Sequence, residues 1–169
     1  DELHALGLGA VGLSPVVDAA NMKIVREADL IVCIGFDPIE LRDAWLDAWP
    51  QDRAVVTLDW GPLHHRIFPL GRECYGHLPA LLGQLSSSGE AGASAWPEAT
   101  LKACRDEVAH IVRPRSPAKG ISPAGLFKAV SDRIAPDWKL TVDVGAHRIL
   151  ANHAVKCRSP GQLLQSNGL

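Results

Sequence analysis

The sequence predicts an α/β fold in which parallel sheets are flanked by helices. Three short runs have the length and the β-branched content of strands, and they are apolar throughout, as is typical of parallel strands covered on both faces. Segments with apolar residues at helical spacing lie between and around them. The three runs are LIVCIG at 30–35, AVVTLD at 54–59 and LTVDVG at 140–145.

Five segments around these runs are expected to be helical. In 39–49, Leu41, Trp45 and Trp49 follow one another at a spacing of four, which favours a packing role for both tryptophans. Ser122 and Pro123 have the residue types that open a helix. The expected helices cover 16–28, 39–49, 78–85, 97–112 and a segment from Ser122 that leads towards the run at 140.

Two coil-favouring stretches interrupt this order of strands and helices. SSSGEAGASA at 86–95 and RPRSPAKG at 113–120 are rich in residues that favour turns and linkers. The second stretch is the better domain boundary, because it separates a long helical pattern from the next one. We therefore expect one α/β part over 1–112, a linker over 113–120 and a second part over 121–169.

The composition points to a globular protein that binds small molecules. The 169 residues are 47% hydrophobic and carry a net charge of -2, with no long run of either sign, so neither nucleic acid nor a membrane is an expected partner. The N-terminus lacks the pattern of a signal peptide, which favours a cytoplasmic location. The widely spaced Cys33, Cys74, Cys104 and Cys157 indicate neither a zinc site nor a disulfide framework.

The segment Gly7–Gly12, GLGAVG, matches the GxGxxG spacing of dinucleotide-binding loops. That fingerprint requires a strand directly before it and an acidic residue at the end of the second strand. Only six residues precede Gly7, and Asp29 lies at the start of a predicted strand rather than at its end. A dinucleotide site is therefore not expected here.

Asp37 follows the strand that Gly35 closes, at the end of the sheet where α/β proteins bind ligands. It can contact a nucleotide or cap the helix that begins near Pro38, and capping is the favoured reading.

The histidines show no metal-ligand spacing. His64, His65 and His77 lack a partner at the HxxxH distance and are expected to be solvent-exposed. His147 and His153 lie six residues apart, so on a helix they point to different faces and cannot bind one ion together.

The junction Val144–His147 is the candidate anion site. A strand that ends at Val144 and passes directly into a helix would direct the free N–H groups of Gly145, Ala146 and His147 outward, at the positive end of the helix dipole. Gly145 leaves room for a phosphate, and His147 can add a side-chain donor. A tight strand-to-helix turn with a surface histidine explains the same residues equally well. Asp143 is assigned a structural role.

These segments, in this order, resemble the thiamine diphosphate (TPP)-dependent enzymes of the acetolactate synthase type over nearly the whole chain. LGLGAVGLS, EADLIVCIGFDPIE and AVVTLD resemble the second half of that family's middle domain, a DHS-like domain of nucleotide-binding type. SPAGLFKAVSDRIAPDWKLTVDVGAH and PGQLLQSNGL resemble the beginning of its C-terminal TPP-binding domain.

The resemblance implies a fragment of a lyase or transferase that cleaves or forms a C–C bond in a 2-keto acid. In the family, the segment matching Val144, Gly145, Ala146 and His147 holds the cofactor diphosphate, although relatives usually carry glutamine at the position of Ala146. A second departure from the family is at Tyr75-Gly76-His77, where relatives often carry a Gly-Asp pair.

The resemblance also implies which parts this chain lacks. Magnesium would bridge the diphosphate to an Asp-Gly-Asn type motif beyond Leu169, and the activating glutamate would come from a neighbouring subunit of a homodimer or homotetramer. No catalytic residue and no metal ligand is therefore expected in the chain, which alone should be inactive.

FAD is not expected either, because relatives with a structural flavin usually carry an arginine soon after the strand glycine, where this chain has Phe36–Glu40. The alternative function is a non-catalytic nucleotide-binding or assembly module.

Overall fold

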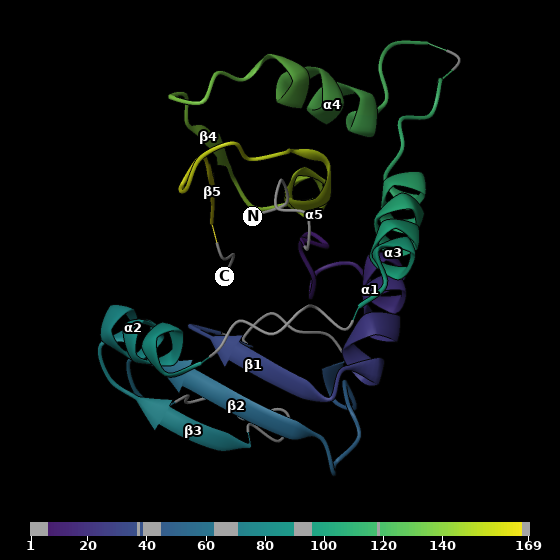
Figure 1. The fold of residues 1–169 in the computed structure, drawn as a ribbon. Helices are drawn as coiled ribbons and strands as arrows, with labels where there is room; N and C mark the ends of the chain where they lie inside the picture. The colour runs from purple at the N-terminus through teal and green to yellow at the C-terminus, as the bar shows by residue number, and fades with distance from the viewer. Residues whose placement is uncertain are drawn as a thin grey trace. The chain divides into compact units, whose positions relative to one another are not determined.

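The fold is α/β, with parallel sheets flanked by helices, as predicted (Figure 1). The computed structural model describes residues 7–36, 38, 45–62, 71–89, 96–117 and 119–166. The chain forms two compact units. One draws on residues up to Ala20 and from Glu98 onward, and the other is formed by Asn21–Pro97.

The unit formed by Asn21–Pro97 contains a three-stranded parallel sheet in the order β1-β2-β3. The ladder continues past the strand ends, because the N–H of Gly35 donates to the carbonyl of Leu58 and that of Gly76 to Asp59, both at 2.9 Å. The helix that follows β3 packs on β2. The elements are β1 (Leu30–Ile34), β2 (Ala54–Asp59), β3 (Arg72–Tyr75) and α2 (Leu78–Ser88).

Tryptophan packing dominates the core of this unit. Trp45 and Trp49 are 3% and 5% exposed and pack in one cluster with Cys33 and Val55, so the predicted packing role of both tryptophans is confirmed. Burial of such large side chains is a major source of stability. The second half of α1 (Pro15–Glu27) adds Met22 to this cluster.

The other unit contains a two-stranded parallel sheet, β4 (Leu140–Val142) and β5 (Leu163–Gln165). The helices around it are α3 (Glu98–Ile111), α4 (Pro123–Arg133) and α5 (Ala146–Ala154), of which α4 packs on α5. The predicted start of α4 is confirmed, since the Ser122 hydroxyl accepts a hydrogen bond from the N–H of Gly125 at 3.1 Å and Pro123 opens the first turn.

Gln162 connects three segments of this unit and is only 1% exposed. Its Nε2 donates to the carbonyl of Ala135 at 2.7 Å, and its Oε1 accepts from the N–H of Arg158 at 2.7 Å. Its own carbonyl accepts from the N–H of Leu140 at 2.8 Å. The buried side chain of Gln162 therefore connects the segment after α4 with the turn before β5. Its backbone carbonyl forms a hydrogen bond with the first residue of β4.

Several elements differ from the prediction. β3 and β5 were not expected from the sequence, because RECY and LLQ are short and β3 carries two charged residues. The run at 140–145 forms a strand only to Val142. In the predicted helix 39–49, residues 39 to 44 lie outside the described residues, and 46 to 49 form turns, as suits the position just before Pro50.

The described residues of the predicted linker 113–120 lie in neither helix nor strand after Val112. The domain boundary predicted there stays a prediction. Within the described part of the chain, no helix has the length and apolar character needed to cross a membrane.

We predict that Gly71→Ala destabilises the three-stranded sheet. Gly71 has a φ of +65°, and a Cβ there would lie 2.1 Å from the carbonyl oxygen of Val55, so the backbone must move. The expected loss is about 2 kcal/mol or more in urea unfolding followed by tryptophan fluorescence. Gly61→Ala is the matched control, because nothing lies within 4 Å of its Cβ position. Equal stability of the two variants would contradict the prediction.

We also predict that Gln162→Met costs about 2–4 kcal/mol, because it leaves the N–H of Arg158 and the carbonyl of Ala135 without their partner. Methionine keeps the length of the side chain, so the loss reports the hydrogen bonds rather than a cavity. Urea unfolding followed by far-UV circular dichroism measures it, with the exposed Gln51→Met as control. A loss no larger than that of the control would show that the amide contacts contribute little.

Candidate functional site

The candidate anion site lies where β4 gives way to α5 (Figure 1). The switch from strand to helix is present, but the prediction that the strand reaches Val144 is wrong, because β4 ends at Val142 and α5 begins at Ala146. At this point Oδ1 of the Asp143 carboxylate accepts a hydrogen bond from the N–H of Val144 at 2.7 Å, so that this amide is held by a side chain. Asp143 thus has a structural contact.

Gly145 is the N-cap of α5 and has a conformation that favours glycine. Its φ is 142° and its ψ 173°, and it offers no side-chain cap. An added Cβ would lie 2.7 Å from Cε1 and 2.8 Å from Nδ1 of His147. The His147 imidazole therefore lies over the α-carbon of Gly145, at the N-terminal end of the helix.

Three backbone donors at this corner form no hydrogen bond with any described residue: the N–H groups of Gly145, Ala146 and His147. The neighbouring amides are used, since Val144 donates to Asp143 and Arg148 donates to the carbonyl of Gly145 at 3.0 Å. All three residues are exposed. Free N–H groups at the positive end of a helix dipole favour an anion, so this corner has the donors that a phosphate group requires.

Two further residues shape the corner and were missed in the sequence. Nη1 of Arg148 donates to the carbonyl of Ser166 at 2.8 Å, and Nε2 of Gln165 donates to the carbonyl of Arg148 at 3.2 Å. These contacts tie the first turn of α5 to the end of β5. No local pattern predicts them, because they depend on the parallel pairing of β4 with β5.

The glycine-rich segment at Gly7–Gly12 contacts a residue of the chain itself. Residues 7 to 14 form no strand before α1, and the N–H of Gly12 donates to Oδ1 of the fully buried Asp18 at 2.7 Å. Gly12 has a φ of 102°, which a residue with a side chain rarely adopts. The described geometry thus gives Gly12 a structural role at the start of α1.

Of the remaining candidates Asp37, His64, His65 and His77, the structure describes His77. Asp37, His64 and His65 lie outside the described residues. His77 is exposed at the N-cap of α2, and its ring meets that of Trp60 edge-on at 5.2 Å between centroids. Among the described residues, no three His, Cys, Asp or Glu side chains are grouped so that they could hold a metal ion.

The cysteines are free thiols. Burial raises the pKa of Cys33, while a hydrogen bond with Thr57 acts in the opposite direction. In the core cluster Cys33 packs as a small apolar residue.

His153, in the last turn of α5, is the functional candidate that sequence reasoning missed. Its Nδ1 and Nε2 are both buried and have no hydrogen-bond partner among the described residues. Burial lowers the pKa of His153 below its ordinary value of 6.5, and the negative charge of Asp18 partly opposes this shift. Unsatisfied buried polar atoms are rare and call for a specific explanation. His147 is exposed, in contrast to the buried ring nitrogens of His153.

We predict that His153 makes the protein less stable in mild acid. Because the folded pKa lies below 6.5, the unfolded chain binds the proton more tightly, and stability falls as the pH drops through 6.5 towards the folded pKa. The melting temperature measured from about pH 8 to pH 5 should show this slope, and His153→Phe should flatten it.

His77→Phe is the control, because His77 is exposed. Asp132 also has a lowered pKa, owing to its hydrogen bond from Lys128. The stability that its carboxylate contributes is lost only below pH 3.8, which is outside the pH range of the His153 test. A slope that persists in His153→Phe would contradict the assignment.

Comparison with known proteins gives one informative relationship. No protein-family model matches the chain. The catabolic acetolactate synthase of Raoultella terrigena is 29% identical to it over 167 residues, which cover 95% of this chain and 29% of that protein. The chain thus spans less than a third of the length of this relative. It is distantly similar to a catabolic acetolactate synthase along almost its whole length.

Proposed function

We propose that this chain is part of a TPP-dependent enzyme that acts on 2-keto acids, and that Val144, Gly145, Ala146 and His147 hold the cofactor diphosphate. The observation that carries the proposal is the set of exposed N–H groups at Gly145–His147, which have no partner among the described residues. The distant similarity to a catabolic acetolactate synthase supports it.

The residues of the corner fit a diphosphate in three respects. Three backbone donors and the helix dipole attract negative charge, and the place that a Gly145 side chain would take is occupied by the His147 ring, a polar group that can itself contact a phosphate. The His147 ring over Gly145 lies where it can add a side-chain donor. When bound, thiamine diphosphate supplies the carbanion and the electron sink for the bond next to the carbonyl. The part of this chain is to bind and orient the diphosphate.

The charges around the corner indicate that the chain needs help to neutralise the diphosphate. The Asp143 carboxylate lies beside the corner and repels an anion, and the Arg148 guanidinium donates to the carbonyl of Ser166. Within the described residues there is no group of metal-ligating side chains for magnesium. We infer that the magnesium ligands and the catalytic glutamate come from segments or subunits outside this chain, so the chain alone binds TPP weakly and turns over no keto acid.

Amide chemical shifts of the 169-residue chain test this site. We expect TPP with magnesium, and inorganic pyrophosphate with magnesium, to shift the resonances of Gly145, Ala146 and His147 with a dissociation constant on the order of millimolar. The two ligands should affect the same amides, because both present a diphosphate. Shifts confined to other residues would overturn the assignment, and tight binding without added segments would show that the charge argument is wrong.

Ala146→Asp separates binding from folding. A carboxylate in the first turn of α5 favours the helix but repels the diphosphate, so the shifts at the corner should disappear while the melting temperature holds. Ala80→Asp makes the same change in the first turn of α2 and should leave binding intact.

Ala146→Gln should tighten pyrophosphate binding by about threefold, since an amide side chain adds one donor. Clearly tighter binding of ADP than of TPP and pyrophosphate in these titrations would instead favour the non-catalytic nucleotide-binding module.

A further inference from the structure

A second candidate site lies in the same unit, in a cavity of about 540 Å³ lined by α3, α4, the last turn of α5 and the segment Gly7–Ala10. None of the residues Val144–His147 lines it. Its volume falls in the range of small-molecule sites.

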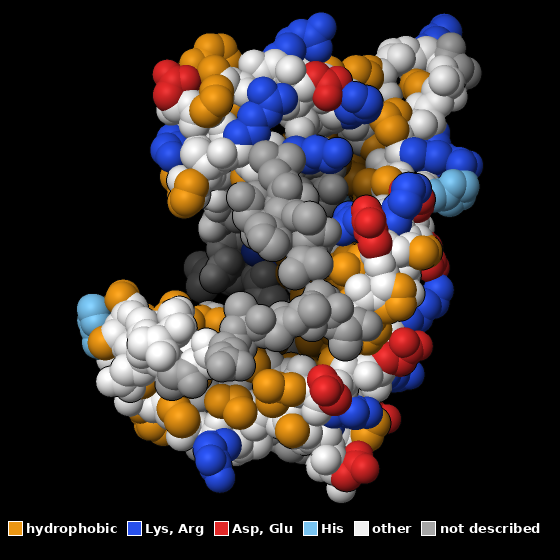
Figure 2. Space-filling view, viewed as in Figure 1, with side chains coloured by type: hydrophobic (Ala, Val, Ile, Leu, Met, Phe, Trp, Pro, Cys, Tyr) orange, Lys and Arg blue, Asp and Glu red, His pale blue; other side chains and the backbone are white. Residues whose placement is uncertain are grey.

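The cavity wall carries more positive than negative charge. Four cationic side chains and two carboxylates line it: Arg105, Arg113, Lys128, Lys156, Asp106 and Asp132. Figure 2 shows blue Lys and Arg side chains gathered over α4 and the adjoining end of α3, with fewer red acidic groups among them. An anion is therefore the favoured occupant.

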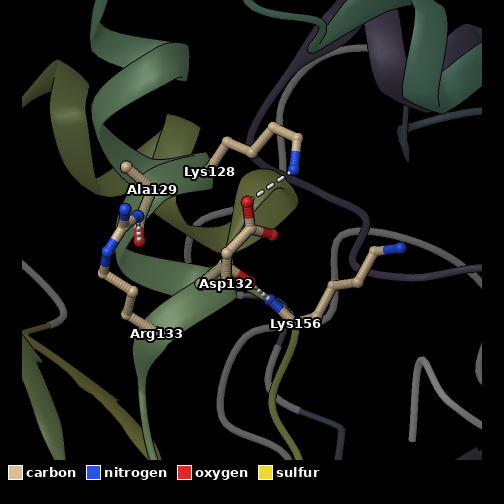
Figure 3. Close-up of polar contacts among 6 residues, drawn as sticks. Lys128, Ala129, Asp132, Arg133 and Lys156 are labelled. Carbon is tan, nitrogen blue, oxygen red and sulfur yellow. Dashed lines mark hydrogen bonds and ion pairs between the residues drawn. The ribbon is translucent and has the colours of Figure 1, made fainter.

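Both carboxylates already have partners. Asp132 accepts from Nζ of Lys128 at 2.7 Å, and Asp106 pairs with Lys102, which does not line the cavity. Lys156 is different, because its ammonium forms no hydrogen bond or ion pair with any described residue. Figure 3 shows Lys128 directed at Asp132 while the side chain of Lys156 extends away from that pair. The backbone of Lys156 is held, since its N–H donates to the buried Ser131 hydroxyl at 2.9 Å.

A second, independent observation comes from His153, which lines this cavity with two buried ring nitrogens that lack partners among the described residues. A neutral imidazole can donate one hydrogen bond and accept another. The remaining wall is largely apolar, formed by Val108, Ala109, Val112, Pro114, Ala124 and Ala154. The lining thus combines cations, an unused polar ring and an apolar surface.

We propose that this cavity binds a small organic phosphate, a phosphate dianion attached to an apolar body. The dianion lies near Lys156 and Arg113, and the apolar body packs against α3. A rotation of the His153 ring, whose nitrogens are buried here, brings one N–H to the cavity surface, where it donates to a phosphate oxygen. This site is separate from the diphosphate corner and does not depend on the proposed function.

Phenyl phosphate is a suitable probe, because it joins a phosphate dianion to an apolar ring. We expect it to bind the chain with a dissociation constant on the order of 0.1–1 mM in calorimetry at about 0.15 M salt. Inorganic phosphate, which lacks the ring, should bind about tenfold more weakly, and phenol should show no measurable binding. Equal affinities for phosphate and phenyl phosphate would overturn the proposal.

Charge-removing variants locate the site. Lys156→Gln and Arg113→Gln should each weaken phenyl phosphate binding by about fivefold, whereas Arg115→Gln should change it less than twofold. Arg115 is the matched control, because it is exposed, lies two residues from Arg113 and does not line the cavity. His153→Phe should also weaken binding, since it removes the donor and keeps a ring of similar size. Unchanged affinity in Lys156→Gln and Arg113→Gln would show that the anion binds elsewhere.

The two candidate sites are distinguished by Ala146→Asp. This variant should abolish the pyrophosphate shifts at the corner and leave phenyl phosphate binding unaltered. Loss of phenyl phosphate binding in Ala146→Asp would overturn the cavity proposal and place the anion at the corner. Loss of pyrophosphate binding in Lys156→Gln would count against the corner instead.

Discussion

The corner at α5 depends on the parallel pairing of β4 with β5, and Gln162 fixes that pairing. Its side-chain amide joins the carbonyl of Ala135 to the N–H of Arg158, and its own carbonyl accepts from Leu140 where β4 begins. A buried amide of this kind is stable only when its donors and acceptors are satisfied together, so the register of both strands is specified at one point. The Arg148 contact with Ser166 then follows from that register.

The two candidate sites use opposite ends of α5 and therefore need different chemistry. At the N-terminus the backbone supplies the donors, and the dipole favours an anion without any cationic side chain. At the C-terminus, near His153, the dipole is unfavourable for an anion and the backbone offers carbonyls. An anion there requires side-chain charge, and this is where Lys156 and the cations of α3 and α4 lie.

Much of the fold could be predicted from the sequence because its signals are local. β1 and β2 are continuous apolar runs, and the start of α4 has a serine cap followed by proline. β3 and β5 could not be predicted, because four- and three-residue strands with polar members are defined by pairing with a partner distant in sequence. The residue types at Val144–His147 indicated an anion site, and their assignment to a cofactor stays a prediction. The end of β4 at Val142 depends on its pairing with the short β5, and the burial of the His153 nitrogens depends on tertiary packing, so neither leaves a periodic pattern.

The corner and the cavity also differ in how much positive charge they offer to an anion. The corner has donor geometry but little favourable charge, because Asp143 repels an anion and Arg148 is directed to a carbonyl. A diphosphate carries more negative charge than three neutral N–H groups can balance, so a cation from another segment must accompany it. The cavity has its cations within the unit and needs no metal to attract a dianion. The buried, unsatisfied nitrogens of His153 carry an energetic cost that a bound phosphate would offset, and the exposed ammonium of Lys156 supplies positive charge. Of the two candidate sites, the cavity is therefore the one whose own side chains supply the positive charge that an anion needs.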